Sequence, residues 1–594
     1  MALLRLYLRI APGLTVALIG CALLAGLLVP ALAVASGVLV DRLAHQRDPW
    51  PALAVIGALF LLQRLLAPVQ QIAGNALSRR IGEAVNQRVM WAMAGPPGLA
   101  HVEDPAVHDR MARALGSITG ITPGSAASRL GGVWRERLQG VLSLAIVVAW
   151  HWWAAALLAS AAALSFAITR WHWHQVTLVI YGRTERLRRS YYLRRLALTS
   201  ALAKETRVFG LADWLVEHYR RGWLAVMQEI WRKRREGWLA ALLLFGGLAV
   251  LEGVVLAVLV REALAGQISV GQVVTLVSAI AAAGALGVFH DGHQQLAEAR
   301  LTLREVEQLE RTTAQASGVA GGERGADGLP EREIRLEGVG FTYPGRSEPV
   351  FRQLDLTIEA GRSLAIVGDN GAGKTTLVKL LARLYDPGAG RITVDGIDLR
   401  QIDARKWHRR VAAIFQDFVQ FELTARDNVA FGALHRRDDA PAVALAAEQA
   451  GAAPIVASLA QGWNTPLGRQ FSNGAELSGG QWQRLALARA LFAVRSGAGL
   501  LVLDEPTASL DVRGEAQVYD RFLELTRGIT TIVISHRFST VRRADRIVVL
   551  ENGQVVEDGT HDQLVAQNGR YATMYRLQAA RFQTEPDQAE AADA

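Results

Sequence analysis

The sequence contains one cysteine, Cys21, and this residue lies inside an apolar run. A single cysteine excludes an intramolecular disulfide and a cysteine-based metal cluster, so a small secreted fold is not indicated. Charged residues are also scarce, at 20% of the 594 residues, whereas apolar residues make up 51%. A chain of this length is too long for one ordinary core, and we expect at least two domains.

The apolar residues are concentrated in the first half of the chain. A membrane-spanning helix needs about 20 mostly apolar residues. Six segments are candidates: 14–40, 50–74, 137–151, 152–169, 238–260 and 268–289. The third and fourth are short and meet at Trp150-His151-Trp152, which we interpret as the tight turn of a helical hairpin. The alternative is a single span there, which would place the two halves of the chain on opposite sides of the membrane.

The net charge of +9 comes largely from arginines in two connections of the first half, 75–136 and 170–237. A basic chain can bind nucleic acid, but positive loops kept in the cytosol explain this distribution better. We therefore expect no nucleic-acid partner, a multi-pass protein of the cytoplasmic membrane, and both termini in the cytosol.

Both basic connections are too long for structureless loops in a compact protein. We expect the membrane helices to continue into the cytosol and to turn back near 96–105 and 204–210. These turns are predicted to touch the soluble domain.

Polar residues inside predicted spans are costly in lipid and are functional candidates. Arg64 and Glu252 would either pair with each other or line a water-filled path, and the sequence leaves both interpretations open. His290, Asp291 and His293 close the sixth candidate span, where an interfacial position is favoured over ligand binding.

Glycine-rich, polar residues at 312–331 predict a flexible linker. The chain is thus divided into a membrane domain (1–311), the linker, a second domain (332–581) and an acidic tail (582–594) that we expect to be disordered.

The second domain contains a phosphate-binding loop that fits G-x-x-x-x-G-K-[ST]. An apolar run at 363–367 predicts a buried strand before the loop, and 375–384 predicts a helix after it. Glycine-rich backbone and a helix N-terminus together form an anion site. Lys374 would neutralise phosphates and Thr375 would hold Mg²⁺. The expected ATP-binding residues of the loop are Gly368, Asp369, Asn370, Gly371, Ala372, Gly373, Lys374, Thr375 and Thr376.

A second apolar run, 500–503, ends in Asp504 and Glu505. Such a run predicts a buried strand that delivers a carboxylate to its C-terminal tip, where α/β sheets bind ligands. We expect Asp504 to reach Mg²⁺ and Glu505 to act as the general base or to position the attacking water.

Between these motifs lies Leu477-Ser478-Gly479-Gly480-Gln481, followed by a helical segment. The order of phosphate loop, Leu-Ser-Gly-Gly-Gln and Leu-Asp-Glu resembles the ATP-binding cassette (ABC) family, and the preceding half resembles its exporters. The resemblance covers nearly the whole chain. It implies an α-helical transmembrane domain of six helices, extended into the cytosol, followed by an α/β phosphate-loop ATP-binding cassette domain. The implied activity is ATP hydrolysis coupled to transport, with ATP and Mg²⁺ bound.

The resemblance also assigns roles to single residues. Tyr343 matches the aromatic residue that stacks on adenine, and Gln416 matches the glutamine that meets Mg²⁺ and the attacking water. His536 matches the histidine that senses the γ-phosphate. The loop that crosses between two such domains matches Ser509, Leu510 and Asp511.

In the family, the signature serves the ATP held by the opposite subunit, so one chain is a half-transporter. A homodimer with two active sites is favoured, and a heterodimer with a similar chain remains open. Weaker similarity, in segments such as Lys204–Gly210 and Gly480–Gln483, points to bacterial exporters of modified peptides such as lantibiotics. One departure is Gly468-Arg469-Gln470-Phe471, where many exporters have Gly-Glu-Arg-Gly.

We expect export of a peptide or another amphipathic compound by alternating access. A lipid flippase and an ATP-dependent membrane sensor that moves no cargo are the alternatives.

Overall fold

The computed structural model describes residues 2–116, 120–182, 184–199, 202–319, 321–505, 522, 524–535 and 537–584. The chain forms two compact units. The first comprises Met1–Gly95 and Asp104–Gln315, and the second comprises Pro96–Glu103 and Ala316–Ala594.

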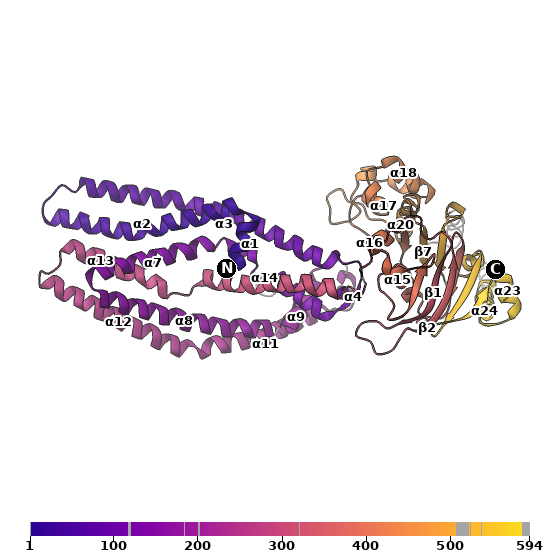
Figure 1. Cartoon of the computed structure of the whole chain (residues 1–594), viewed down its shortest axis with the longest axis horizontal. Coiled ribbons are helices and arrows are strands. Elements are labelled where there is room, and N and C mark those ends of the chain that lie inside the picture. The colour runs from indigo at the N-terminus through magenta and orange to yellow at the C-terminus, as the bar shows by residue number, and fades with distance from the viewer. Residues whose placement is uncertain are drawn as a thin grey trace. The chain divides into compact units, whose positions relative to one another are not determined.

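The first unit is helical (Figure 1). Its elements are α1 (Ala2–Ile10), α2 (Pro12–Ala44), α3 (Trp50–Ala94), α5 (Pro105–Ala114), α6 (Pro123–Ala127), α7 (Leu130–Trp150), α8 (Trp152–Gly182), α9 (Thr184–Leu198), α10 (Ala203–Val208), α11 (Ala212–Glu236), α12 (Trp238–Leu264), α13 (Val270–Ala283), the 3₁₀ turn η2 (Gly284–Gly287) and α14 (Asp291–Gln315).

A helix is present at each of the six predicted spans. Five segments are long and apolar enough to cross a membrane: Pro12–Ala44, Trp50–Ala94, Trp152–Val179, Leu242–Leu264 and Val270–Gln315. The predicted third span, α7, does not meet this criterion because its first half contains Arg135, Glu136 and Arg137. Among the described residues, each of the six predicted spans therefore contains a helix, but only five lie in segments apolar enough to cross a membrane.

The hairpin between the third and fourth predicted spans is confirmed, since α7 ends at Trp150 and α8 begins at Trp152. Trp150 Nε1 donates to one carboxylate oxygen of Glu262, and His151 Nε2 lies 2.8 Å from the other. One carboxylate of α12 thus holds the turn.

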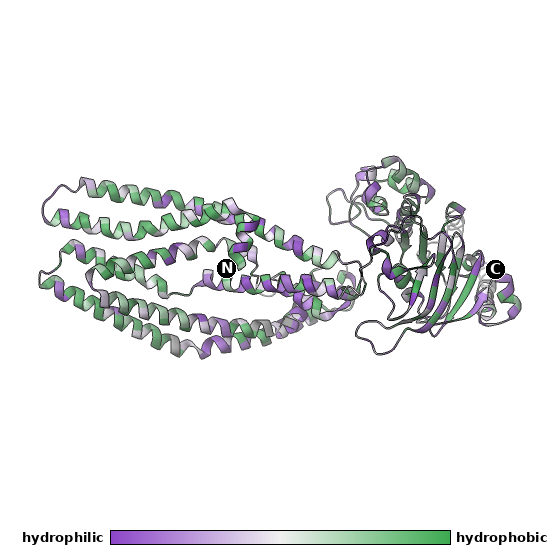
Figure 2. Ribbon diagram, viewed as in Figure 1, coloured by the Kyte–Doolittle hydropathy of each residue, from purple (hydrophilic) through white to green (hydrophobic). Residues whose placement is uncertain are grey.

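The helices extend well beyond the predicted spans. α3 continues to Ala94, twenty residues past the predicted end at 74, and α11 precedes α12 with only Gly237 between them. Apolar residues are concentrated along α2, α3, α12 and α13, while hydrophilic residues are frequent on α9, α11 and α14 (Figure 2). Exposed apolar side chains such as Leu65 and Leu243 are those expected at a lipid-facing surface.

Arg64 and Glu252 do not form the ion pair that the sequence allowed. The guanidinium of Arg64 lies 5.1 Å from the ring centroid of Phe60 on its own helix. Glu252 faces the start of η2, where a Cβ on Gly284 would lie 3.7 Å from its carboxylate oxygen. A role for either side chain in lining a path stays a prediction.

The second unit is built on two sheets (Figure 1). Its helices of four residues or more are α4 (Ala100–Glu103), α15 (Lys374–Leu381), α16 (Ala404–His408), α17 (Ala425–Ala430), α18 (Ala440–Gln449), α19 (Ala453–Ala457), α20 (Gly479–Arg495), α22 (Phe538–Val541), α23 (His561–Gln567) and α24 (Arg570–Thr584). Its strands are β1 (Glu333–Phe341), β2 (Phe351–Glu359), β3 (Ser363–Val367), β4 (Ala389–Val394), β5 (Ile397–Asp398), β6 (Val411–Ile414), β7 (Leu500–Asp504), β8 (Thr530–Ile534), β9 (Arg546–Glu551) and β10 (Gln554–Gly559).

The larger sheet has the order β10-β9-β3-β8-β7-β6, and all pairs except β10 with β9 are parallel. Every residue of β7 and β8 is buried, as expected for parallel strands covered on both faces. The smaller sheet, β2-β1-β4-β5, is antiparallel. Parallel strands place their carboxyl ends at one edge, and the phosphate loop and Glu505 follow two of these ends, those of β3 and β7.

The predicted linker differs from the structure in two respects. Residues 312–315 belong to α14, and the following residues belong to the second unit. The backbone N–H groups of Glu323 and Arg324 donate to the carbonyl of Gln401, and Ala326 is buried. Much of this glycine-rich segment is therefore packed against the second unit.

The first predicted turn region does reach the soluble domain. Leu99 N–H donates to the carbonyl of Leu384, and Lys379 Nζ lies 3.5 Å from a carboxylate oxygen of Glu103. Residues 96–103 are thus part of the second unit, although they lie between two helices of the first.

Candidate ATP-binding site

The phosphate loop connects β3 to α15. Gly368, Gly371 and Gly373 have φ angles of 151°, 87° and 104°, in the region that favours glycine. Close packing adds to this requirement, because a Cβ on Gly373 would lie 2.7 Å from the ring of Phe351. The three glycines therefore allow the loop to turn tightly and to present its N–H groups.

Lys374 points back into its own loop. Its Nζ donates to the carbonyls of Gly368 at 2.6 Å and Asp369 at 3.0 Å. The residue is 8% exposed, and burial lowers the pKa of its ammonium group, while the carboxylates of Glu505, Asp504 and Asp369 act in the opposite direction. The loop thus places a cation where phosphate groups are expected.

Asp504 and Thr375 meet at the tip of β7. Thr375 Oγ1 donates to Asp504 Oδ2 over 3.2 Å, and Asp504 is 2% exposed. Burial raises the pKa of this carboxyl group, and the Thr375 hydrogen bond partly offsets that effect. A carboxylate and a hydroxyl are hard oxygen ligands of the kind that Mg²⁺ prefers, so these two residues fit the expected ion.

Glu505 is the next residue and turns away from the strand. Its φ angle is 47°, which is uncommon for a residue other than glycine, and its N–H donates to the carbonyl of Ile534. Gln416 Nε2, two residues beyond the end of β6, donates to Glu505 Oε2 over 2.8 Å. The carboxylate that we expect to orient water is therefore held by an amide from another strand.

Tyr343 lies beside the loop. Its hydroxyl is 3.1 Å from Thr376 Oγ1, and Lys379 Nζ lies 5.2 Å from its ring centroid. The expected stacking of Tyr343 on adenine stays a prediction.

The signature begins the 17-residue helix α20. Leu477 is buried, whereas Ser478 and Gly479 are exposed. Ser478 is the N-cap: its Oγ accepts from Gln481 N–H, and the Gln481 side chain accepts from Ser478 N–H. Leu477 anchors the start of the helix, which presents small residues and N–H groups to solvent. Such a surface suits an anion from outside the chain.

Two groups of predicted residues lie outside the described part of the chain. They are His536 and the loop residues Ser509, Leu510 and Asp511. Their roles stay predictions.

The departure at 468–471 has a local explanation. Arg469 forms an ion pair with Glu476, and Gln470 Nε2 donates to Glu422. Two carboxylates from other positions thus contact the residues of this departure.

Sequence reasoning missed the contact between the phosphate loop and α24. Arg570, the first residue of α24, pairs with Asp369 of the loop and lies 3.2 Å from Glu551. The two partners are 201 positions apart, and no local pattern links them.

Residues 351–508 match the family model described as ABC transporter. The second unit contains an ABC transporter domain. An "ATP-dependent lipid A-core flippase" of Alcanivorax borkumensis is 43% identical to the chain over 244 residues, which are 41% of this chain and 40% of that protein. The chain thus matches about two fifths of the length of this relative. The "Subtilin transport ATP-binding protein SpaT" of Bacillus subtilis is 26% identical over 524 residues, 86% of this chain and 82% of that protein.

A solved structure, "Structure of a bacterial Atm1-family ABC exporter with ATP bound", superposes on this domain and the helical unit with a TM-score of 0.70. It is 24% identical in sequence and covers 94% of this chain and 97% of that chain. The expected fold is therefore confirmed: a helical domain with several apolar helices precedes an α/β ABC domain, as in an Atm1-family exporter.

Proposed function

We propose that the chain is one half of an ATP-driven bacterial exporter that works as a dimer in the cytoplasmic membrane, with both termini and the ATPase domain in the cytosol. The observation that carries the proposal is the meeting of Lys374, Thr375, Asp504 and Glu505 at the ends of β3 and β7. The described residues of the same chain include five segments long and apolar enough to cross a membrane.

The residues at these strand ends have different roles in hydrolysis. Lys374 and the loop N–H groups bind phosphate oxygens, and Thr375 and Asp504 hold Mg²⁺, which neutralises charge on the phosphates. Glu505, oriented by Gln416, positions the attacking water and accepts its proton.

The exposed N-terminus of α20 supports the dimer. Ser478 already caps its own helix, and its neighbours Gly479 and Gly480 leave the helix end open to a ligand. In a twofold dimer, each signature would complete the site of the partner. A homodimer is the simplest arrangement, and a heterodimer would require a second, similar chain.

A peptide-like cargo is favoured by the extent of similarity. The match to the subtilin transport protein covers 524 residues, more than either unit contains, so it includes helical and ATP-binding parts. The match to a lipid A-core flippase has higher identity but covers only 41% of this chain. Cargo contacts are expected in the helical unit, so the longer match carries more weight, and lipid flipping is the second candidate.

Inverted membrane vesicles test the proposal. We expect ATP-dependent accumulation of a fluorescent lanthionine-containing peptide and none with Glu505→Gln. Accumulation of a fluorescent lipid in its place would favour the flippase. ATPase activity that responds to the peptide without any accumulation would favour a sensor.

A further inference from the structure

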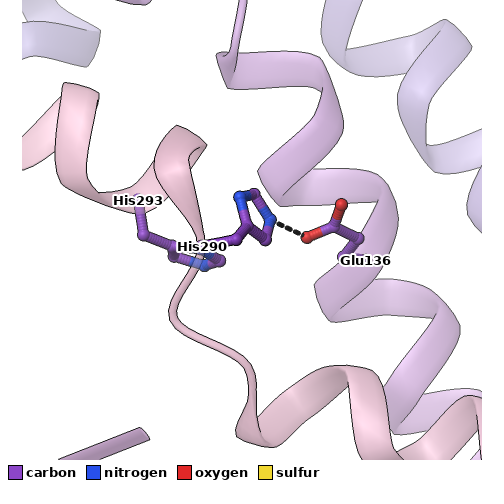
Figure 3. A group of neighbouring side chains, drawn as sticks. All are labelled: Glu136, His290 and His293. Carbon is purple, nitrogen blue, oxygen red and sulfur yellow. Dashed lines mark hydrogen bonds and ion pairs between the residues drawn. The ribbon is translucent and has the colours of Figure 1, made fainter. Parts of the chain in front are cut away.

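The helix of the sixth predicted span, 268–289, is interrupted near the end of that span. The helix α13 ends at Ala283, η2 covers Gly284–Gly287, and α14 starts only at Asp291. Figure 3 shows the non-helical chain between the two helices. Backbone groups freed by such a break in a membrane unit need partners from neighbouring helices.

α7 supplies one partner and packs closely against the break. Arg137 Nη1 donates to the free carbonyl of Leu286 over 2.9 Å, and the guanidinium lies 4.3 Å from the ring centroid of Phe166 on α8. A Cβ on Gly140 would lie 2.4 Å from the Leu286 side chain. Contacts with α7 and α8 therefore stabilise the break.

His290 uses both ring nitrogens at the break. Its Nδ1 accepts from Gly292 N–H over 2.9 Å, so the ring caps the first turn of α14. Its Nε2 contacts the Glu136 carboxylate on α7, as the dashed line in Figure 3 marks. A backbone N–H can only donate, so Nδ1 carries the lone pair and Nε2 carries the hydrogen. The cap therefore requires the neutral ring in this one tautomer.

His293 lies beside this pair. Arg137 Nη2 is 3.0 Å from His293 Nε2, and since a guanidinium only donates, the hydrogen of the neutral ring sits on Nδ1. That Nδ1 is buried and has no hydrogen-bond partner among the described residues.

The cluster of Glu136, His290 and His293 has the composition of a metal site, with one ligand atom of each residue within 4.8 Å of the others. A histidine that binds a metal through one nitrogen donates a hydrogen bond from the other. Here the outer nitrogens, His290 Nδ1 and His293 Nε2, face the donors Gly292 N–H and Arg137. The surroundings of both rings therefore oppose a bound cation.

We propose that His290 is a proton-operated hinge in this helix. A proton on Nδ1 replaces the acceptor with a donor, so the cap on Gly292 N–H is lost and the break extends into the first turn of α14. The contact to Glu136 persists as an ion pair, which keeps the break tied to α7. Imidazole is the side chain that changes charge between pH 5 and 8.

Charged groups of both signs surround the hinge. Glu136 and Asp291 are acidic, Arg137 is basic, and the N-terminus of α14 carries the positive end of the helix dipole. Arg135 lies 3.8 Å from Glu136, and Arg129 lies 3.8 Å from Asp291. The uncharged ring of Phe166 faces the cluster from α8, and Glu252 of α12 faces the other end of the break.

Hydrogen exchange of the full chain in lipid nanodiscs tests the hinge. Mass spectrometry measures the protection of residues 286–296 against exchange, relative to the unprotected rate, at pH 5.5 and 7.5. We expect wild-type protection to fall about fivefold at the lower pH, the size of a lost helix cap. His290→Asn keeps an acceptor at the Nδ1 position, so protection stays high at both values. His290→Gln keeps a donor toward Glu136 without the cap, so protection is low at both. His218→Gln, on α11 and outside the 286–296 region, is the matched control and should behave as wild type.

Equal wild-type protection at both pH values would overturn the hinge, and so would wild-type pH dependence in His290→Asn. If Zn²⁺ alone raised protection of wild type but not of His293→Asn, the cluster would be a cation site and the proposal would fail. The wild-type series and His290→Asn decide the matter even if His290→Gln does not fold. The measurement uses neither ATP nor cargo, so it stands apart from the proposed export function.

Discussion

Gln416 Nε2 donates to Glu505 Oε2 over 2.8 Å, which joins the ends of β6 and β7 across 89 positions of sequence. The Glu505 carboxylate is therefore positioned by Gln416, which lies in the segment between β6 and α17. A movement of that segment would therefore change the orientation of the Glu505 carboxylate.

Replacing Glu505 by glutamine separates ATP binding from hydrolysis. An amide has the same shape but cannot accept the proton of the attacking water, so we expect turnover to fall by about 100-fold or more while ATP binding is retained. Phosphate release and binding of a fluorescent ATP analogue measure the two quantities. Glu448→Gln, at an exposed position of α18, should leave both unchanged. Turnover near wild type in Glu505→Gln would remove the assigned role.

Replacing Asp504 by asparagine should stabilise the nucleotide-free protein. Burial raises the pKa of Asp504, so the folded state bears a cost for the ionised carboxylate at neutral pH. The gain from asparagine is therefore present above the raised pKa and disappears at acid pH, where Asp504 itself is protonated. We expect a higher melting temperature at pH 7.5, by about 2–4 °C for each kcal/mol gained, and loss of Mg²⁺-dependent ATPase activity.

Asp438→Asn is the control for this measurement, because its side chain is 89% exposed. A lower melting temperature in Asp504→Asn at pH 7.5 would show that the buried carboxylate stabilises the fold.

Much of the ATP-binding site could be predicted from sequence because its residues follow buried strands. The runs 364–367 and 500–503 are apolar throughout, and each ends at a motif whose chemistry requires a strand tip. The contacts of Arg570 with Asp369 and of Leu99 with Leu384 could not be predicted, since they join distant segments without any local pattern.

The sixth predicted span, 268–289, ends just before α14, but the 3₁₀ turn at its end was not predicted. Hydropathy separates the apolar α13 from the polar α14, but it does not show where the helical backbone stops within the apolar part. The histidine at position 290 and the glycines at 284 and 287 were the available signals, but each is tolerated inside a membrane helix. The contacts from α7 that hold the break join segments about 150 positions apart, and no local pattern predicts them.

Close approach of α2 and α13 depends on two glycines. A Cβ on Gly37 would lie 2.4 Å from the carbonyl of Gly271, and a Cβ on Gly271 would lie 2.2 Å from the carbonyl of Gly37. Small residues at such contacts let helix backbones meet in membranes. We expect Gly37→Leu to destabilise the purified protein by about 1–3 kcal/mol or to prevent its assembly.

The control on the same helix is Gly20→Leu, because no atom lies within 4 Å of a Cβ built there. Thermal unfolding in detergent compares the two variants. Equal melting temperatures would show that the close packing of α2 against α13 does not contribute to the stability of the protein.

Mixed dimers test whether each signature completes the partner's site. We expect no ATPase activity from Lys374→Ala alone or from Ser478→Arg alone. Co-expression with two affinity tags yields a mixed dimer in which the intact phosphate loop of one chain faces the intact signature of the other. One of two sites is then complete, so activity should return to about half of wild type. A mixed dimer as inactive as its parents would argue against shared sites.

The packing of Pro96–Glu103 within the second unit makes the protein hard to divide. The chain passes from one unit to the other at three places, after Gly95, after Glu103 and after Gln315. A single protease cut in the glycine-rich segment would therefore leave the ATP-binding unit anchored by an intact loop of the membrane half. A separately expressed cassette that starts after this segment would also lack Leu99 and Ala100, and would expose the apolar surface that these two residues cover.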